Sequence, residues 1–213
     1  MNRMSEIIIL TLLASCLALA GCGLAQTATD NTGTQTLAPE AAADSLSYQL
    51  DSFTQNRRYL EIRIHDLINV KRAQSGLVAL DWEEKLSEIA RYHSQDMADR
   101  DYFDHLSPEG EDFSARYAMF GYDPTNRVGN TVYLGAENLF LNNMYDSYTY
   151  NKDTGEVVDY SFSTLEDIAN STVDGWMNSE GHRENILMPH FKKEGIGVVF
   201  TQDGKIYITE NFS

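Results

Sequence analysis

Three residues of the chain, His105, Glu137 and His182, combine side chains that can do chemistry with neighbours that restrict the backbone. His105 lies in a segment whose Ser-Pro and Glu-Gly pairs are typical of a loop, and loops often carry functional residues. Glu137 is flanked by small and apolar residues, so an enclosed carboxylate there needs a charged partner or has a raised pKa. His182 follows Gly181 directly after a predicted helix, which restricts the direction of its side chain.

Two imidazoles and a carboxylate can hold a divalent metal ion with an open position, and they can equally act as an acid–base set. Because the three residues come from separate segments, spacing also leaves open that they are two unrelated loop histidines and a buried carboxylate. His93 is expected on the buried face of a helix, where a structural role is commoner than a ligand role. The usual motifs of nucleophilic and zinc hydrolases, Gly-x-Ser-x-Gly and His-Glu-x-x-His, do not occur in the sequence.

Apolar periodicity predicts the elements that must position these residues. Helices are expected at about residues 60–72, 81–100, 113–120 and 165–177, the last with an N-cap at Ser163 or Thr164. Strands are expected at residues 194–201 and 205–212, joined as a hairpin, and residues 144–162 predict a second, tyrosine-rich hairpin. Several helices with a small antiparallel sheet imply a layered α+β domain.

The N-terminus has the pattern of a lipoprotein signal peptide. Arg3 precedes an apolar run at residues 7–20, which is short for a membrane span of about 20 apolar residues. The run ends in Leu-Ala-Gly-Cys, which resembles a lipobox, so we expect residues 1–21 to be removed and Cys22 to be lipidated. Ordinary secretion and an uncleaved anchor are the alternatives. Cys16 would leave with the signal peptide, which excludes cysteine catalysis in the mature domain.

Composition separates a tether from a folded domain. Residues 22–50 are rich in Thr, Ala and Gln and predict a flexible tether, followed by one domain at residues 51–213. The chain is 42% hydrophobic, which is enough to build a core. Its net charge of −16 argues against nucleic acid as a partner, because phosphate binding depends on clustered Lys and Arg.

An ordered set of motifs resembles the prokaryotic CAP domains, also called SCP domains, which are relatives of cysteine-rich secretory proteins, antigen 5 and pathogenesis-related proteins. The motifs are Asn-Val-Lys-Arg-Ala-Gln-Ser-Gly at 69–76, His-Ser-Gln-Asp-Met at 93–97, Tyr-Phe-Asp-His at 102–105, Gly-Ala-Glu-Asn-Leu at 135–139, Trp-Met-Asn-Ser-Glu-Gly-His-Arg-Glu-Asn-Ile-Leu at 176–187 and Gly-Ile-Gly-Val at 195–198. The resemblance covers about residues 55–213, and the order of the motifs is far more specific than any one of them.

The resemblance implies an α+β fold, a three-layer α-β-α sandwich with a small, mostly antiparallel central sheet and an open cleft. Two histidines and two acidic residues line the family's cavity, and in several members they bind a divalent metal such as Zn²⁺. His105, Glu137 and His182 match three of these four positions. Ser179 occupies the fourth, so Ser179, the adjacent Glu180 and His93 are weaker candidates. Residues 141–163 resemble an insertion.

The sequence favours a binding protein over an enzyme. The first hypothesis is a CAP domain held by the lipid on Cys22 at the outer face of the cytoplasmic membrane or the cell surface. Its cleft would bind an extracellular ligand, a lipid, peptide or glycan, with a divalent metal at the three matched residues. The alternatives are a structural or adhesion module without chemistry, a metal-assisted or His/Glu acid–base hydrolase and, for location, a secreted protein.

Overall fold

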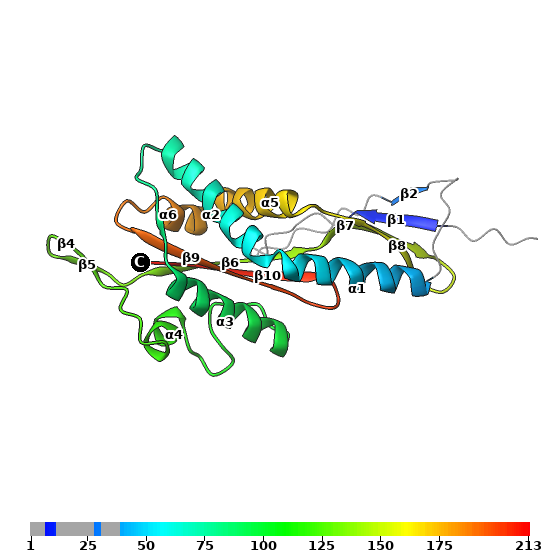
Figure 1. The fold of residues 1–213 in the computed structure, drawn as a ribbon, viewed down its shortest axis with the longest axis horizontal. Coiled ribbons are helices and arrows are strands. Elements are labelled where there is room, and N and C mark those ends of the chain that lie inside the picture. The colour runs from blue at the N-terminus through cyan, green and yellow to red at the C-terminus, as the bar shows by residue number, and fades with distance from the viewer. Residues whose placement is uncertain (1–6, 12–27, 31–38) are drawn as a thin grey trace, which may run out of the picture.

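The computed structural model describes residues 7–11, 28–30 and 39–213 (Figure 1). At its centre is a four-stranded sheet with the order β3-β9-β10-β6. Its strands are β3 (Asp81–Trp82), β9 (Lys193–Phe200), β10 (Lys205–Phe212) and β6 (Ala136–Asn143). The two neighbours of β10 pair with it antiparallel, and the short β3 joins β9 in parallel. The predicted hairpin at residues 194–212 is therefore confirmed as β9–β10.

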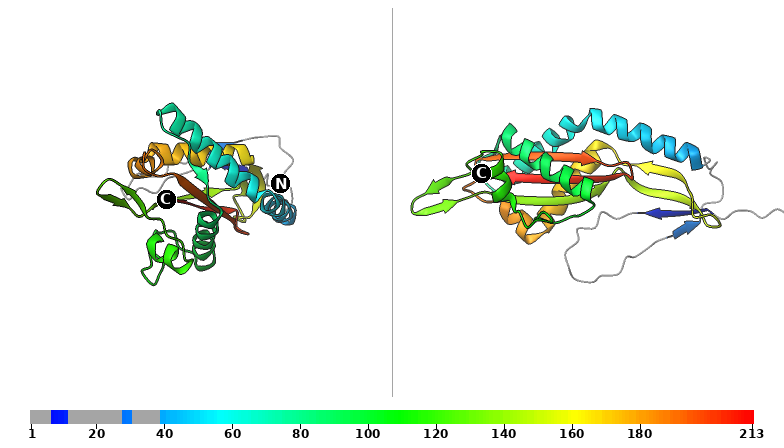
Figure 2. Two further views of the ribbon diagram at one scale, coloured as in Figure 1. Left: turned by 60° about the vertical axis from the view of Figure 1, so that its left-hand side comes forward. Right: turned by 90° about the horizontal axis from the view of Figure 1, so that it is seen from below.

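Helices cover both faces of this sheet (Figure 2). One face carries α2 (Arg57–Gln74), α5 (Leu165–Asn178) and α6 (Glu180–Ile186). The other carries α3 (Glu84–Arg100), and α4 (Phe113–Met119) lies on the same side. The expected α+β, three-layer α-β-α arrangement is confirmed.

The side-chain alternation of β10 explains why two helical layers form. Ile206, Ile208 and Phe212 point to the larger core, which they share with apolar residues of α2 and α5. The intervening Thr209 faces α3, where its hydroxyl lies 2.8 Å from the Ser94 hydroxyl. A Cβ at Gly197 would collide with the α3 backbone, so glycine lets this helix lie close against β9.

Local signals define where the helices begin. Thr164 caps α5 and forms a capping box with Asp167, as its sequence predicts. The helix predicted from Asp81 begins three residues later, because Asp81 belongs to β3 and Glu83 is the N-cap of α3. The sequence correctly predicted a helix here, but it begins later because Asp81 and Trp82 pair with β9.

The tether prediction for residues 22–50 is wrong from Pro39 onward. Residues Pro39–Gln55 form the helix α1, which packs on β8. Its buried face contains Ala42, Leu46 and Phe53, spaced so that they lie on one side of the helix. Burial of this face offsets the ordering entropy that a solvated tether could not recover.

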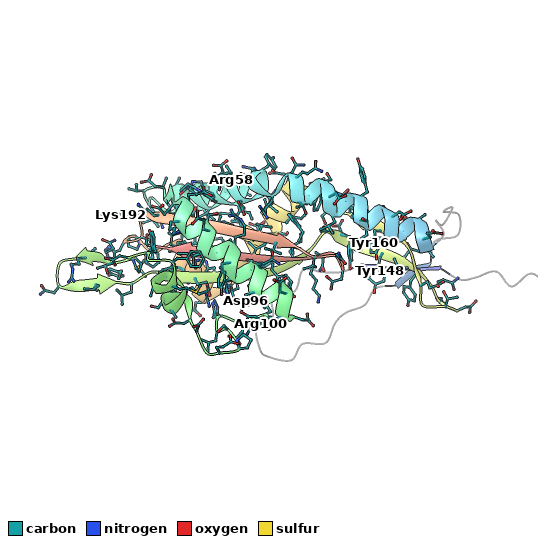
Figure 3. All side chains as sticks on the ribbon, turned by 60° about the horizontal axis from the view of Figure 1, so that its bottom comes forward. Arg58, Asp96, Arg100, Tyr148, Tyr160 and Lys192 are labelled. Atoms are coloured by element: carbon teal, nitrogen blue, oxygen red, sulfur yellow. The ribbon has the colours of Figure 1, made fainter. Side chains whose placement is uncertain are left out.

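The expected excursion at residues 144–162 is a hairpin of β7 (Tyr145–Asn151) and β8 (Val157–Phe162). It forms a second sheet with β1 (Ile7–Thr11) and β2 (Ala28–Asp30), in the order β2-β1-β7-β8. Tyr148 and Tyr160 are paired across the hairpin, with ring centroids 6.4 Å apart (Figure 3). A third, two-stranded sheet that the sequence did not predict joins β4 (Asn126–Val128) and β5 (Thr131–Tyr133).

The predicted signal peptide and lipidation site lie mostly outside the residues that the structure describes. Apart from strand β1, the signal peptide at residues 1–21 lies outside the described residues, as does Cys22. The same is true of most of residues 22–38. None of the helices in the described ranges combines the length and apolarity that a membrane crossing requires. Signal-peptide cleavage and lipidation remain predictions.

Candidate functional site

The site is built around the buried carboxylate of Glu137 on β6. The Arg116 guanidinium of α4 contacts both of its oxygens, with Nη2 at 2.9 Å from Oε1 and 2.8 Å from Oε2. The Glu137 side chain is fully buried and that of Arg116 is 2% exposed, so the ion pair is shielded from water. The sequence therefore predicted correctly that an enclosed carboxylate needs a partner.

Arg116 also ties down the loop that carries His105. Its guanidinium donates hydrogen bonds to the backbone oxygens of Glu111 and His105, both at 3.0 Å. Sequence reasoning missed this residue, because one arginine in a short amphipathic helix is typical of a solvated face. Its only local signal is that it lies beside Tyr117 and one turn after Phe113, in the part of α4 that faces the protein.

His105 is oriented by Glu137 and faces solvent. Its Nδ1 lies 3.0 Å from Glu137 Oε1, and its side chain is 51% exposed. A proton on Nδ1 is donated to the carboxylate, which leaves Nε2 as the acceptor in the neutral ring. Histidine–carboxylate pairs of this kind fix both the tautomer and the direction of the ring.

His182 on α6 approaches the same place from the other helical layer. Its pKa is lowered, first by burial and then by the nearby charge of His105. Its Nδ1 is buried without a hydrogen-bond partner among the described residues. The backbone oxygen of His182 accepts a hydrogen bond of 3.2 Å from Asn138, the residue after Glu137 on β6. His105 contacts Glu137 directly, and His182 lies near enough to His105 for their charges to interact. With Arg116, we call these four residues the histidine site.

Of the three weaker candidates, all in the described part of the chain, His93 lies beside the histidine site, whereas the side chains of Ser179 and Glu180 do not bond to it. His93 is buried, its Nε2 lies 3.8 Å from Glu137 Oε1, and burial lowers its pKa. Its Nε2 also lies 3.0 Å from the backbone oxygen of Asp104, so it supports the His105 loop from behind. Ser179 is half-buried between α5 and α6, and Glu180 is exposed. Within residues 40–213, neither of these two side chains bonds to the histidine site.

Gly135 fixes the start of β6 and hence the position of Glu137. Its φ is +91°, and a Cβ there would lie 2.6 Å from the Phe212 backbone oxygen and 2.8 Å from the Tyr117 ring. Glycine adopts this positive φ without strain, and because it has no Cβ, the Phe212 backbone and the Tyr117 ring can pack this closely against it. The Tyr117 hydroxyl, in turn, donates to the backbone oxygens of Ala136 and Phe212.

The arrangement does not fit a divalent metal. In the part of the chain that the structure describes, no group of three or more His, Cys, Asp or Glu side chains could hold a metal ion. Both oxygens of Glu137 already accept hydrogen bonds, and the Arg116 charge beside them repels a cation. Arg116 supplies the positive charge that a metal would otherwise supply to this carboxylate.

Comparisons with known proteins agree with the sequence motifs. Residues 65–212 match the profile of the CAP family, described as the Cysteine-rich secretory protein family. The chain is 36% identical over 153 residues to the uncharacterized protein YkwD of Bacillus subtilis (strain 168). It is 30% identical over 152 residues to the uncharacterized membrane protein YlbC of the same strain. Each match covers 71% of this chain but only 46% of YkwD and 34% of YlbC, so the chain spans less than half of either relative.

Solved structures with the same fold include surface and extracellular proteins. An extracellular protein containing a SCP domain from Bacillus anthracis superposes with a TM-score of 0.51 and 26% identity, covering 73% of this chain and 40% of its own. An outer surface protein from Borrelia burgdorferi superposes with a TM-score of 0.52, covering 75% of this chain and 92% of its own. Its identity is 18%, so this likeness concerns the fold alone.

Proposed function

Because the chain belongs to the CAP (cysteine-rich secretory protein) family, we propose that it is an extracytoplasmic recognition domain whose histidine site binds a polar group of an extracellular ligand. The observation that carries this proposal is the set of hydrogen bonds that the Glu137 carboxylate accepts. Its carboxylate accepts from Arg116 and from His105, so it orients the exposed ring and is not free to attack a substrate. His105 and His182 are then the groups that can meet a ligand.

The same geometry argues against the hydrolase alternative. Among residues 40–213, neither His105 nor His182 shares a hydrogen bond with a serine or threonine hydroxyl, so no activated nucleophile accompanies them. Acid–base hydrolysis of a bound water would need a carboxylate that can gain and lose a proton. Both oxygens of Glu137 already accept from Arg116 Nη2, so this carboxylate is engaged in an ion pair and is not free to act as that group.

The ligand also has an apolar part. Phe103 is 37% exposed and Leu106 is 49% exposed, and both lie within two residues of His105 in the same loop. Apolar side chains around a few oriented polar groups are typical of small-ligand and peptide sites. A lipid, a peptide and a glycan all offer a polar group next to apolar surface.

Nuclear magnetic resonance of the two imidazole rings tests the proposal. Three probes are added separately to the full chain: phosphatidylglycerol vesicles, a short acidic peptide, and soluble glycan fragments of peptidoglycan. One probe should shift both ring signals saturably, and His105→Ala or His182→Ala should weaken its binding about tenfold, or about 1.4 kcal/mol. His190→Ala is the control, because His190 packs on Tyr133.

Two results would contradict the recognition proposal. One is that none of the three probes shifts either ring. The other is that a variant carrying both His105→Ala and His182→Ala binds like the wild type. If that double variant instead loses thermal stability while binding is unchanged, the structural-module alternative gains support.

The proposed location is the outer face of the cytoplasmic membrane or the cell surface, with the lipid on Cys22 as anchor. The extracellular Bacillus anthracis protein supports an extracytoplasmic location. The lipobox-like Leu-Ala-Gly-Cys sequence and the acidic composition support anchoring and a charged, soluble domain. The lipid on Cys22 would be the contact with the membrane.

A further inference from the structure

A second polar cluster, which we call the carboxyl pair, lies on the opposite face of the central sheet from Glu137. It consists of Glu194 on β9 and Glu210 on β10, whose residues are both 0% exposed. The paired register of the strands, with Glu210 opposite Ile196 and Phe212 opposite Glu194, makes the two carboxyl groups diagonal neighbours, and their charges interact directly. As two ionised groups, Glu194 Oε2 and Glu210 Oε1 would be buried acceptors without a donor. One proton shared between them supplies that donor and removes a like-charge repulsion.

The outer oxygens of the pair are held by neutral donors. His65 Nδ1 lies 2.5 Å from Glu194 Oε1. Asn69 exchanges two hydrogen bonds with the Leu80 backbone, which directs its amide nitrogen toward His65 Nε2 at 3.2 Å. Nε2 is therefore the acceptor and Nδ1 carries the proton, so His65 is neutral and donates to Glu194. Burial lowers the pKa of His65, which agrees with this tautomer.

Two routes connect the pair to α6. In the first, Asn138 donates to Glu210 Oε2 at 2.9 Å and to the His182 backbone oxygen at 3.2 Å. In the second, the buried Arg72 lies in the field of both carboxyl groups and donates to the Ile186 backbone oxygen at 2.6 Å. The pair is thus linked to the first turn of this short helix by hydrogen bonds through Asn138, and to its last residue through its charge interaction with Arg72.

We propose that the shared proton of Glu194 and Glu210 is a pH-sensitive clasp that holds α6, and with it His182, against the central sheet. With one proton, the pair has a single negative charge that Arg72 balances. Without that proton, two adjacent negative charges are buried, and Arg72 supplies only one positive charge to balance them. The other charged groups around the cluster are Arg58, Asp66 and Asp81, which act on His65. β6 contributes only the neutral amide of Asn138.

The direction of the pH effect follows from linkage. Burial raises the pKa of Glu194 to about 7 and raises that of Glu210 well above its ordinary value. In the unfolded chain both would have ordinary carboxyl values near about 4.3. A raised folded-state pKa stabilises the fold fully below the unfolded value, and this stabilisation is lost as pH rises through the folded value. The shared proton is the one held at the higher of the two values, so the clasp stays closed through neutral pH and loosens as pH rises above about 7, where Glu210 also loses its proton.

Hydrogen exchange on the full chain tests the clasp, with rates corrected for the intrinsic effect of pH. Wild-type amides of α6 should lose protection about tenfold or more as pH rises from about 7 to about 10, while those of α4 on the other face change less. Glu210→Gln mimics the protonated carboxyl and should keep α6 protected throughout. Glu184→Gln, an exposed change on α6 itself, should behave like the wild type.

Each contrary result overturns the proposal. It fails if wild-type α6 keeps its protection, if Glu210→Gln loses protection as the wild type does, or if Glu184→Gln also removes the pH response. If Glu210→Gln does not fold, infrared spectroscopy of the wild type decides. A protonated carboxyl band must then persist at about pH 6, where ordinary carboxyl groups are ionised. These readouts need no ligand, so they are independent of the proposed recognition function.

Discussion

Glu137 and Arg116 form a buried ion pair whose partners come from β6 and α4. Its desolvation is costly, and the attraction offsets that cost only because the hydrogen-bond geometry is good and both partners remain. Each partner also has a second role, since Glu137 orients His105 and Arg116 holds two backbone oxygens of the loop that carries it. The pair is therefore a positioning device for the exposed imidazole.

Removing the Arg116 charge should lower the stability of the fold. Arg116→Met leaves the Glu137 charge buried, so the free energy of unfolding at neutral pH should fall by about 3–5 kcal/mol in urea denaturation. Arg100→Met is the control, because Arg100 pairs with the exposed Glu109 and should cost less than about 1 kcal/mol. A loss for Arg116→Met no larger than that of the control would rule out the positioning role.

The carboxylate can be neutralised as a second step. Adding Glu137→Gln to Arg116→Met removes the stranded charge, so the double variant should lose less stability than the two single changes summed. Strict additivity would mean that the two side chains do not interact in solution. Both variants should also broaden the His105 ring signals, since they release its loop.

At the scale of elements, α1 differs most from the sequence-based prediction. Residues Pro39–Gln55 have Ala42, Leu46, Leu50 and Phe53 on one face, yet their surroundings are polar and resemble a linker. The helix is stabilised by tertiary packing on β8 and the larger core. β8 lies within residues 141–163, which the sequence predicts to be an insertion, and this segment creates the surface that α1 covers.

A single substitution separates a packed helix from a tether. Leu46→Ala should lower the free energy of unfolding by about 2–5 kcal/mol, because Leu46 is buried between α1 and the core. Tyr48→Ala on the same helix is 76% exposed and should change stability by no more than about 0.5 kcal/mol. Thermal or urea denaturation of the full chain measures both, and equal, negligible effects would restore the tether interpretation.

At the scale of the whole molecule, function depends on where the domain is held. A lipid on Cys22 would place the recognition domain at a membrane surface, at the end of the chain that precedes α1. The excess of acidic residues that gives the whole chain a net charge of −16 would keep it away from an anionic surface. Stable anchoring by lipid generally takes more than one acyl chain.

The anchor has a direct test with an internal control. Cys22→Ser should shift the protein from the membrane fraction to the soluble or secreted fraction and abolish metabolic labelling with a fatty-acid analogue. Cys16→Ser should retain both properties, because Cys16 lies inside the segment that we expect to be removed. A wild-type protein that is not labelled, or a Cys22→Ser variant that stays with the membrane, would contradict lipidation.

The sequence by itself determined the family, the layered architecture, α2, α3, α5, the two main hairpins and three members of the histidine site. These features follow from local periodicity, capping and ordered motifs, which a linear chain carries whatever its partners in space. Tertiary structure decided the rest. Arg116, the carboxyl pair and the apolar face of α1 have ordinary local signals, and only packing from distant segments makes them buried. Burial turns a common charged side chain into a positioning group or a proton-sharing one, because removal from water is what makes its partners necessary.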